Sequence, residues 1–348
     1  MPASRSGERG DWNAAWWSAA RLVPTAALTL FGLLLATFLI ARVVPIDPAL
    51  AVLGDRASPE SYARERAALG LDRPLYVQFY RYIAGVAHAD FGRSAVTHNL
   101  VTEDIGRFFP ATVELATTAT LLGVALGIPA GVWAAARRGR FGDQLVRTIG
   151  LFGYSVPVFW LGMMALLVFY VDLGWAAGPG QIDSGFEDFV PHVTGFLVLD
   201  ALIAGDWDAL RSALSHLVLP ACVLGYFSFA YISRMMRSFM LQELGQEYIV
   251  AAGAKGLSRR RVLWVHALRN ARLPLITVIA LAYAGLLEGS VLTETVFSWP
   301  GIGQYITNSL LAIDMNAVLG GTLVIGLVFI GLNVTADLAY RLLDSRTR

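Results

Sequence analysis

The chain has 348 residues, of which 56% are hydrophobic and only 15% are charged, and its mean hydropathy is +0.56. A soluble globule of this length needs more polar surface, so the composition excludes that class and indicates a polytopic membrane protein. A single cysteine excludes an intrachain disulfide. The net charge of +1 identifies no partner, because in a membrane protein the distribution of charge among the loops is informative.

Six stretches are long and apolar enough to cross a bilayer core of roughly 30 Å, which takes about 20 helical residues. They are residues 22–41, 113–136, 148–171, 217–236, 274–293 and 318–340. The predicted fold class is therefore an all-α membrane protein with six transmembrane helices. Residues 1–21 form a polar lead-in, and the lack of a small-residue cleavage site after the first span favours a membrane anchor over a signal peptide. Residues 42–112 are long and mixed in charge, and 74–86 has an amphipathic helical pattern that would rest on the membrane or the bundle.

Basic residues are distributed unevenly among the segments between these spans. The segment after the second span carries four arginines against one acid, and the one after the fourth carries eight basic residues against two acids. Residues 172–215 carry seven acids against Arg211 alone. Because short basic segments stay in the cytoplasm, we predict that both termini and the two basic segments are cytoplasmic. Residues 42–112 and 172–215 are then extracytoplasmic.

Glycine and proline interrupt several of the predicted spans. They are Gly127, Pro129 and Gly131 in the second span, Pro157 in the third, and Pro220 and Gly225 in the fourth. Small residues let helices approach closely, and neighbouring helices can satisfy the backbone groups that proline frees. Tight packing and hinges in a bundle that opens therefore explain these residues equally well.

The sequence lacks the motifs of several enzyme classes. It contains no GxxxxGK[ST] phosphate loop and no HExxH, GxSxG or CxxC motif, and its five histidines are scattered. We expect no catalytic residues, no metal and no cofactor, and the chain cannot bind ATP through a phosphate loop.

Ionisable groups, which secondary transporters use for ion coupling, occur in the predicted spans only near their ends. They are Glu114, Arg234, Glu288 and Asp337, with Asn333 as a polar residue inside the sixth span. Glu288 and Asn333 are the candidates for lining a translocation path. A carboxylate that reaches water at the outer interface is the simpler explanation of Glu288, and it is favoured.

A small-residue stretch, EYIVAAGAKGLSRRR, lies between the fourth and fifth spans. Glu247, Ala251 and Ala254 recur at helical spacing and would share one face. Gly256 suits a left-handed helix terminator, and Ser258 suits the N-cap of a second helix. The pattern predicts two short helices joined by a sharp corner on the cytoplasmic side.

Three explanations of this stretch remain. A basic loop that follows the positive-inside rule explains the arginines but not the alanine-rich face. A DNA-binding helix-turn-helix has a similar pattern, but a few residues tether this one to spans on both sides, so we expect no nucleic acid. A docking knob would place small residues in a partner's groove, with charges such as that of Lys255 fixing the register.

The longer stretch EYIVAAGAKGLSRRRVLWVHALRNARLP resembles the cytoplasmic coupling motif of ABC-importer permeases of the peptide/nickel branch. Agreement in order and spacing extends over nearly the whole chain from about residue 22, through LGLDRPLYVQFYRYIAG, DFGRS, PATVELA, SVPVFWLGMM, HLVLPACVLG and TETVFSWPGIGQYI. Val250 departs from the general motif by occupying the place of its acid, and the gap from Gly256 to Leu273 is longer than usual. Both departures are typical of the peptide branch.

This resemblance implies a type I ABC importer transmembrane domain over residues 110–341, with a cytoplasmic coupling loop at 237–272, in the inner (plasma) membrane. The chain would be a permease subunit that moves di- or oligopeptides, paired with a second homologous permease, two ATP-hydrolysing subunits and an extracytoplasmic binding protein. The substrate itself stays open among peptides, nickel chelates, glutathione, opines and haem. The alternatives are an autonomous secondary transporter and a membrane scaffold. The residues implied in ATPase coupling are Glu247, Tyr248, Ala251, Ala252, Ala254, Lys255, Gly256 and Ser258.

Overall fold

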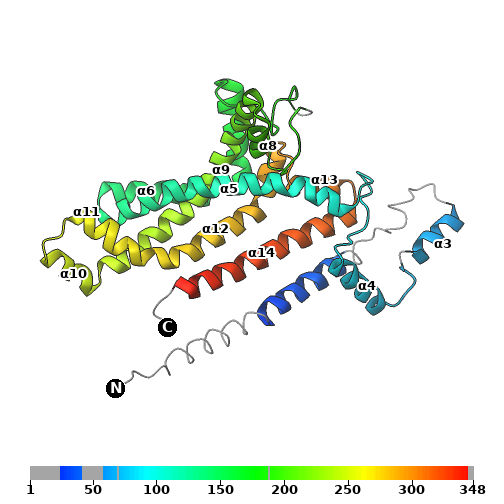
Figure 1. The fold of residues 1–348 in the computed structure, drawn as a ribbon, viewed down its shortest axis with the longest axis horizontal. Coiled ribbons are helices and arrows are strands. Elements are labelled where there is room, and N and C mark those ends of the chain that lie inside the picture. The colour runs from blue at the N-terminus through cyan, green and yellow to red at the C-terminus, as the bar shows by residue number, and fades with distance from the viewer. Residues whose placement is uncertain (1–23, 41–57, 69, 187–188, 344–348) are drawn as a thin grey trace, which may run out of the picture.

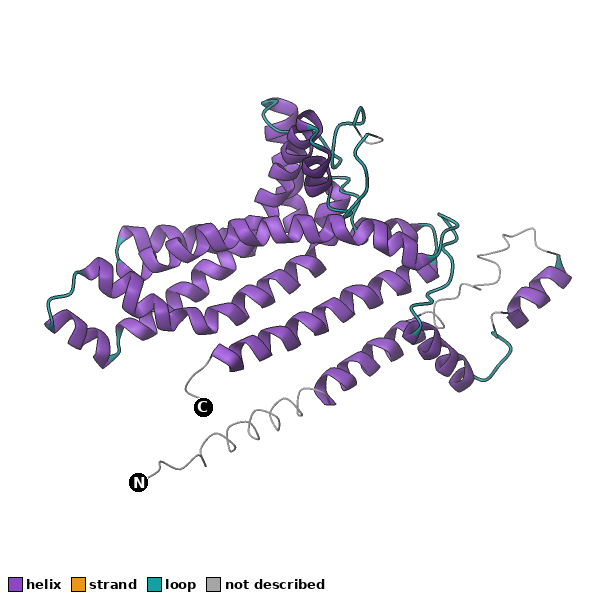
Figure 2. Cartoon of the chain, viewed as in Figure 1, coloured by secondary structure: helices purple, strands orange, loops and turns teal. Residues whose placement is uncertain are grey.

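The computed structural model describes residues 24–40, 58–68, 70–186 and 189–343. Helices joined by loops make up this described part, with one isolated bridge between Arg93 and Leu100 (Figure 2). The predicted lead-in at 1–21 and residues 41–57 lie outside the described residues. The prediction of an all-helical chain is therefore confirmed for the part that the structure describes.

The helices follow one another in chain order as shown in Figure 1. They are an unlabelled first helix Pro24–Ile40, α3 Pro59–Ala68, α4 Leu75–Ala87, α5 Val101–Ala136, α6 Phe141–Ser155, α7 Val158–Ala165, η1 Leu166–Asp172, α8 Leu197–Ala204, α9 Trp207–Leu244, α10 Glu247–Ala254, α11 Arg259–Arg261, η2 Val262–Ala267, α12 Leu268–Val296, α13 Ile302–Leu311 and α14 Met315–Leu343. Two of them, η1 and η2, are π-helical.

Four helical runs are long and apolar enough to cross a membrane. They are α5, α9, the continuous run Arg259–Val296 that joins α11, η2 and α12, and the part of α14 up to Leu338. The pair formed by α6 and α7–η1 would make a fifth span if it counts as one. The first helix is apolar but has only 17 residues. The membrane-protein prediction is confirmed, whereas the count of six spans and the orientation of the termini stay predictions.

The third predicted span is wrong as a single straight helix. Its two halves are bent by 101° at Val156 and Pro157 (Figure 1). Proline disfavours the helical conformation in the residue before it, and Val156 is extended, with φ −97° and ψ 127°. The helix ends at Ser155 and a new one starts at Val158. Proline therefore bends the chain here, although α5 and α9 continue through prolines of their own.

The long helices α5 and α9 pack through glycine. Gly123, Gly127 and Gly131 are spaced four residues apart on one face of α5, and all three are buried. A Cβ at Gly131 would lie 2.6 Å from the Cβ of Met236, and a Cβ at Gly123 would collide with Ser228. For the glycines of α5 the prediction of tight packing is confirmed, whereas a hinge role stays a prediction.

The amphipathic helix predicted at 74–86 is α4, and it packs against the first helix. The hydroxyls of Tyr82 and Thr37 are 2.8 Å apart, and the rings of Phe79 and Phe38 are 5.1 Å apart between centroids. Tyr76 and Tyr80, one turn apart on α4, are 76% and 74% exposed. The helix therefore rests on the bundle and turns an aromatic face outward.

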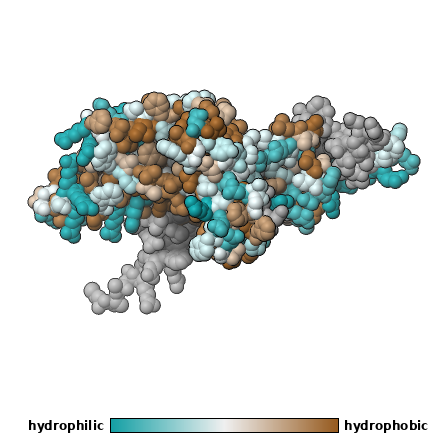
Figure 3. Space-filling model, turned by 90° about the horizontal axis from the view of Figure 1, so that it is seen from above, coloured by the Kyte–Doolittle hydropathy of each residue, from teal (hydrophilic) through white to brown (hydrophobic). Residues whose placement is uncertain are grey.

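Hydrophobic side chains cover much of the visible surface of the long bundle in Figure 3, whereas hydrophilic ones gather at the end that carries α10 and α11. The arginines at 137, 138, 140 and 259–261 are exposed at that end. We call it the corner end. The opposite end of α5, where α13 lies (Figure 1), is called the far end.

Candidate functional site

The predicted corner, residues 247–258, lies at the tip of the corner end (Figure 1). It consists of the eight-residue helix α10, a short turn, and the start of α11. The chain arrives from α9 and leaves through the continuous run into α12. Two long helices therefore hold the corner from both sides.

Backbone geometry fixes the turn of this corner. Gly256 has φ +78°, a left-handed conformation that glycine adopts without steric cost. The N–H of Gly256 donates to the carbonyl of Gly253 at 2.9 Å, and the N–H of Leu257 donates to that of Ala252 at 3.3 Å. This pair of bonds is a Schellman motif, which satisfies the last carbonyls of α10. The predicted left-handed terminator is confirmed.

Ser258 starts the next helix, as predicted. Its backbone is extended, with φ −61° and ψ 144°, and its Oγ accepts a hydrogen bond from the N–H of Arg261 at 3.4 Å. An N-cap of this kind satisfies a donor that the first turn of a helix leaves free. Only Leu257 separates the terminator of α10 from the N-cap of α11, so the corner has little freedom to change its angle.

One face of α10 packs into the chain's own core. Ile249 and Ala252 are 8% and 6% exposed, and they belong to a buried cluster with Met240 and Val262. Ala252, which the resemblance implies in ATPase coupling, therefore faces the core of the chain, and its role in coupling stays a prediction. It lies three positions after Ile249, and i, i+3 neighbours share a face, so it turns inward with the isoleucine.

The other face of α10 is exposed. Glu247, Ala251, Ala254 and Lys255 lie on it, and Val250 beside them is 68% exposed. A Cβ added to Gly253 would contact nothing within 4 Å. The corner therefore presents small side chains and one apolar residue to whatever lies outside the chain.

Tyr248 lies at the side of the corner rather than on its tip. Its hydroxyl donates to the carboxylate of Glu243 in α9. The ring lines a cleft of about 490 Å³ that Arg269 and Arg272 of α12 also line. Tyr248 thus ties α10 to α9 and borders a basic cleft.

Two arginines brace the helices behind the corner. Arg259 donates to the carbonyl of Ala136 at the end of α5. Arg237 of α9 forms a bidentate ion pair with Asp143 of α6, with 2.8 Å between Nη2 and Oδ2. Asp143 is 1% exposed. A buried carboxylate needs such pairing, so α6 and α9 are fixed to each other.

Two buried glutamates organise the opposite part of the molecule, and sequence reasoning missed one of them. Glu294 is fully buried and accepts from the hydroxyl of Thr112 at 2.7 Å, the hydroxyl of Ser290 at 2.8 Å and the N–H of Gln304 at 3.0 Å. These bonds join α5, α12 and the start of α13. One signal in the sequence could have identified Glu294. It is an acid a few residues before the helix that begins after Trp299, Pro300 and Gly301, and acids are favoured near helix N-termini.

Glu114, noted in the sequence as a candidate near the end of a span, has a similar role. It is 8% exposed and accepts from Nε2 of Gln181 at 3.1 Å and from the N–H of Val198 at 2.9 Å. Val198 lies in the first turn of α8. Glu114 therefore holds the acidic segment 172–215 against α5.

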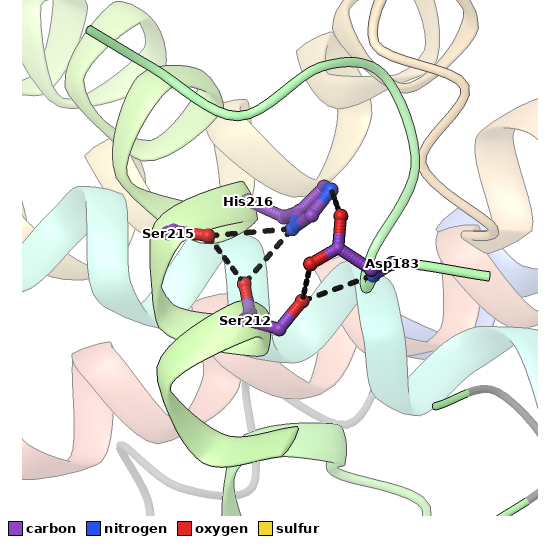
Figure 4. Close-up of polar contacts among 4 residues, drawn as sticks. All are labelled: Asp183, Ser212, Ser215 and His216. Carbon is purple, nitrogen blue, oxygen red and sulfur yellow. Dashed lines mark hydrogen bonds and ion pairs between the residues drawn. The ribbon is translucent and has the colours of Figure 1, made fainter. Parts of the chain in front are cut away.

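The acidic segment is also tied to α9, as Figure 4 shows. Ser212 donates its hydroxyl to Asp183 at 2.6 Å and accepts the N–H of Asp183 at 3.0 Å. His216 lies with Nε2 3.7 Å from the Asp183 carboxylate and Nδ1 2.8 Å from the carbonyl of Ser212. This segment is thus a folded surface and not a loose loop.

Asp200 closes the loop ahead of α8. Burial alone would raise the pKa of this carboxyl, but hydrogen bonds from Thr194 and from the N–H groups of Val193 and Gly195 outweigh burial and lower the pKa. The carboxylate is 1% exposed. It therefore stays charged and fixes three consecutive backbone groups.

The candidates for a translocation path lie on different helices. Glu288 is exposed on α12, next to Gly285 and Gly289, where an added Cβ would contact nothing within 4 Å. Asn333 is half-buried on α14. No hydrogen bond between described residues joins these two side chains. Among the described residues, no three His, Cys, Asp or Glu side chains form a group that could hold a metal.

Comparison with known proteins finds two family models that together match most of the chain. Residues 127–348 match the family model "Binding-protein-dependent transport system inner membrane component", and residues 19–116 match "Binding-prot-dependent transport system membrane comp, N-term". A chain of the MetNI methionine ABC transporter in an inward-facing conformation superposes with a TM-score of 0.47, at 18% identity over 68% of this chain and 93% of its own.

Curated relatives are much closer. The "Probable D,D-dipeptide transport system permease protein DdpB" of Escherichia coli K12 is 43% identical over 92% of this chain and 94% of its own. The "Dipeptide transport system permease protein DppB" of the same strain is 43% identical, and the "Di/tripeptide transport system permease protein DppB" of Pseudomonas aeruginosa is 41% identical, each over 92% of this chain and 95% of its own. The chain is a multi-pass inner-membrane protein that belongs to the family of binding-protein-dependent transport system inner membrane components.

Proposed function

We propose that the chain is a permease subunit of a binding-protein-dependent ABC importer for di- or oligopeptides. The observation that carries the proposal is the corner. It is a turn between two long helices, and its outer face exposes small side chains. The names of the relatives support the transport class and the peptide substrate. Hydrolysis of ATP would then take place on partner chains.

The proposed arrangement puts the corner end in the cytoplasm. Its exposed arginines agree with the positive-inside rule, and the acidic segment 172–215 at α8 agrees with an outer position. Both termini would be cytoplasmic, with six spans that include the first helix and the bent α6–α7–η1 pair. The folded acidic segment would offer a docking surface to an extracytoplasmic binding protein, and a second homologous permease would complete the bundle.

The proposed mechanism depends on the stiffness of the corner. Two ATP-hydrolysing subunits would each receive one corner in a surface groove, with Ala251, Gly253 and Ala254 inserted and Glu247 and Lys255 fixing the register. Closure of the ATPase pair then moves the corner, and α12 carries the movement into the bundle. A bound nucleotide can shift the bundle only through different affinity for its two states, so a corner that yielded would uncouple hydrolysis from transport.

We propose that Glu288 borders the path. It lies on an exposed stripe of α12 with Leu281, Gly285 and Leu292, and a charged side chain in a spanning helix normally faces protein or water and not lipid. A peptide carries an ammonium group that a carboxylate attracts. Asn333 on α14 is the second, uncharged candidate for the same path.

The test of the proposal substitutes Gly253→Trp. No atom of the chain within 4 Å obstructs a side chain there, so the bundle should fold and insert normally while the bulky ring keeps the corner out of the partner's groove. We expect at least a tenfold loss of ATPase co-purification and of ATP-driven peptide uptake. Gly106→Trp is the matched control, because Gly106 is also helical, exposed and free of neighbours within 4 Å.

Two results would contradict the proposal. Normal ATPase assembly and uptake in the Gly253→Trp variant would remove the docking role from the corner. Proton-driven uptake by the purified chain alone in proteoliposomes would instead favour the autonomous secondary transporter. A scaffold would show no flux in any assembly.

A further inference from the structure

A basic pocket lies beside the corner, between the ends of α5 and α9. It has a volume of about 380 Å³, and four arginines line it: Arg137, Arg138 and Arg140 from the turn after α5, and Arg259 from α11. The other lining residues are alanine, leucine and glycine. Four positive charges therefore meet around one hollow that contains no acidic side chain.

The turn that carries three of these arginines is rigid. The N–H of Arg140 donates to the carbonyl of Arg137 at 2.9 Å, and the N–H of Gly139 donates to Asp143 at 2.9 Å. Asp143 is the nearest acid in the sequence, and Arg237 of α9 already binds it through two hydrogen bonds. These hydrogen bonds fix the backbone of the turn. The neighbouring carboxylate of Asp143 is paired with Arg237 and does not neutralise the arginines of the pocket.

The four guanidinium groups differ in what they contact. Arg137 lies over the ring of Trp133, 4.8 Å from its centroid, and Arg259 binds the carbonyl at the end of α5. The guanidinium groups of Arg138 and Arg140 make no hydrogen bond or ion pair with any residue in the described part of the chain. Two cations are therefore free to bind an anion from outside.

An apolar stripe begins where the pocket ends. Phe141 directly follows Arg140 and is 78% exposed, and it continues along α6 with Leu145, Ile149 and Phe152, which are 41%, 38% and 60% exposed. These positions recur at helical spacing and form one exposed stripe of α6. Trp133 beside the pocket is 37% exposed as well. A cationic hollow next to an exposed apolar stripe matches a molecule with an anionic head and a hydrocarbon tail.

We propose that the basic pocket binds the phosphate of an anionic phospholipid, whose acyl chain lies along the stripe from Phe141 to Phe152. Arginine is well suited to phosphate because its planar donors bind two oxygens at once, and basic pockets between spanning helices take such headgroups. The choice of the cytoplasmic leaflet depends on the proposed orientation. The site itself does not depend on the proposed transport function.

The experiment measures thermal unfolding of the purified 348-residue chain in mixed micelles. Phosphatidylglycerol is titrated against phosphatidylcholine of the same chain length and, separately, against inorganic phosphate. We expect a saturable rise in Tm with phosphatidylglycerol alone. The double variant Arg138→Gln/Arg140→Gln should weaken its apparent affinity about thirtyfold, since each arginine near an anionic surface contributes about fivefold.

Matched variants make the result specific. Arg260→Gln/Arg261→Gln removes the same charge from the same end, but neither residue lines the pocket, so affinity should stay within about twofold. Arg138→Lys/Arg140→Lys keeps the charge but loses the bidentate geometry, so its affinity should lie between those of the native chain and the glutamine variant, which separates lost binding from misfolding.

Four outcomes would overturn the proposal. An equal rise with phosphatidylcholine would show that lipid binding ignores the headgroup. The same rise with inorganic phosphate would show a free-anion site. Equal losses in both glutamine variants would reduce the effect to general surface charge. Unchanged lipid affinity together with lost ATPase co-purification in Arg138→Gln/Arg140→Gln would assign the pocket to the protein partner.

Discussion

The two ends of the bundle satisfy their helix termini with opposite charges. At the corner end Arg259 binds a carbonyl at the end of α5. At the far end and around α8, buried carboxylates bind N–H groups in the first turns of α8, α13 and α14: Glu114, Glu294 and Asp314 respectively. Both choices follow the helix dipole, which favours cations at carbonyl ends and anions at N–H ends.

The charged groups at the two ends differ in burial and in how many hydrogen-bond partners the same chain provides. The carboxylates are buried, and hydroxyl or N–H groups of the same chain surround them. The arginines and small residues of the corner end are exposed. The polar groups of the far end are therefore satisfied within the chain, whereas the corner end leaves charged and small side chains exposed for contact with proteins or lipids. Three predictions test this contrast.

The largest effect is expected at Glu294. Removing its carboxylate by Glu294→Ala leaves the hydroxyl of Thr112 and an N–H of α13 buried without acceptors, at a cost of about 3 kcal/mol, whereas Ser290 keeps the carbonyl of Leu287 as an acceptor. Glu288→Ala, six residues earlier on the same helix and exposed, should change stability by less than about 0.5 kcal/mol. Denaturant unfolding in micelles measures both. Equal losses would mean that the far end does not depend on its buried acids.

A smaller effect, with a pH dependence, is expected at Asp200. Hydrogen bonds to its carboxylate are worth roughly 2 kcal/mol, and its folded pKa is lowered. The stabilisation is therefore present above the unfolded pKa of about 3.9 and is lost as pH falls toward the folded pKa. Asp200→Asn should remove this acid-side loss. Unfolding curves from pH 7 down to pH 3 check it, and an unchanged profile would refute the assignment.

The smallest effect is expected at the corner itself, where two glycines should respond with opposite signs. Gly256→Ala forces a Cβ into a left-handed conformation and should cost about 1 kcal/mol. Gly253→Ala places the same Cβ in open space on a helix and should stabilise by about 0.5–1 kcal/mol. Local hydrogen exchange of α10 distinguishes the two. Changes of the same sign would mean that the corner angle is not set by Gly256.

Local signals predicted the corner well. Gly256 and Ser258 follow from backbone preferences that depend only on their neighbours in sequence, and the structure has both as expected. The packing of α5 on α9 was also accessible, because glycines at 123, 127 and 131 form a repeat that marks close helix contact. Features of this kind depend on steric properties that a short stretch already contains.

Long-range contacts were not accessible in the same way. Hydropathy predicts one span over 148–171 because it depends only on how apolar the residues are. It does not include the restriction that Pro157 places on the backbone of Val156. Ala252 turns inward because of a cluster built from α9 and the η2 turn, which lie apart from it in sequence. Glu294 binds Thr112 across 182 positions of the chain. Pairs of that separation leave no periodic mark in a single sequence.

The continuous helical run from Arg259 to Val296 connects the corner end of the bundle to the far end. It stays helical for 38 residues, which at 1.5 Å per residue is about 57 Å, and it carries the Ser258 cap at one tip and Glu294 near the other. In the proposed coupling, a displacement of the corner would therefore be transmitted along one continuous helix and not through a loop. The π-helical turns at Val262–Ala267 lie in this run close to the corner, so they are the first part of the run to receive such a displacement.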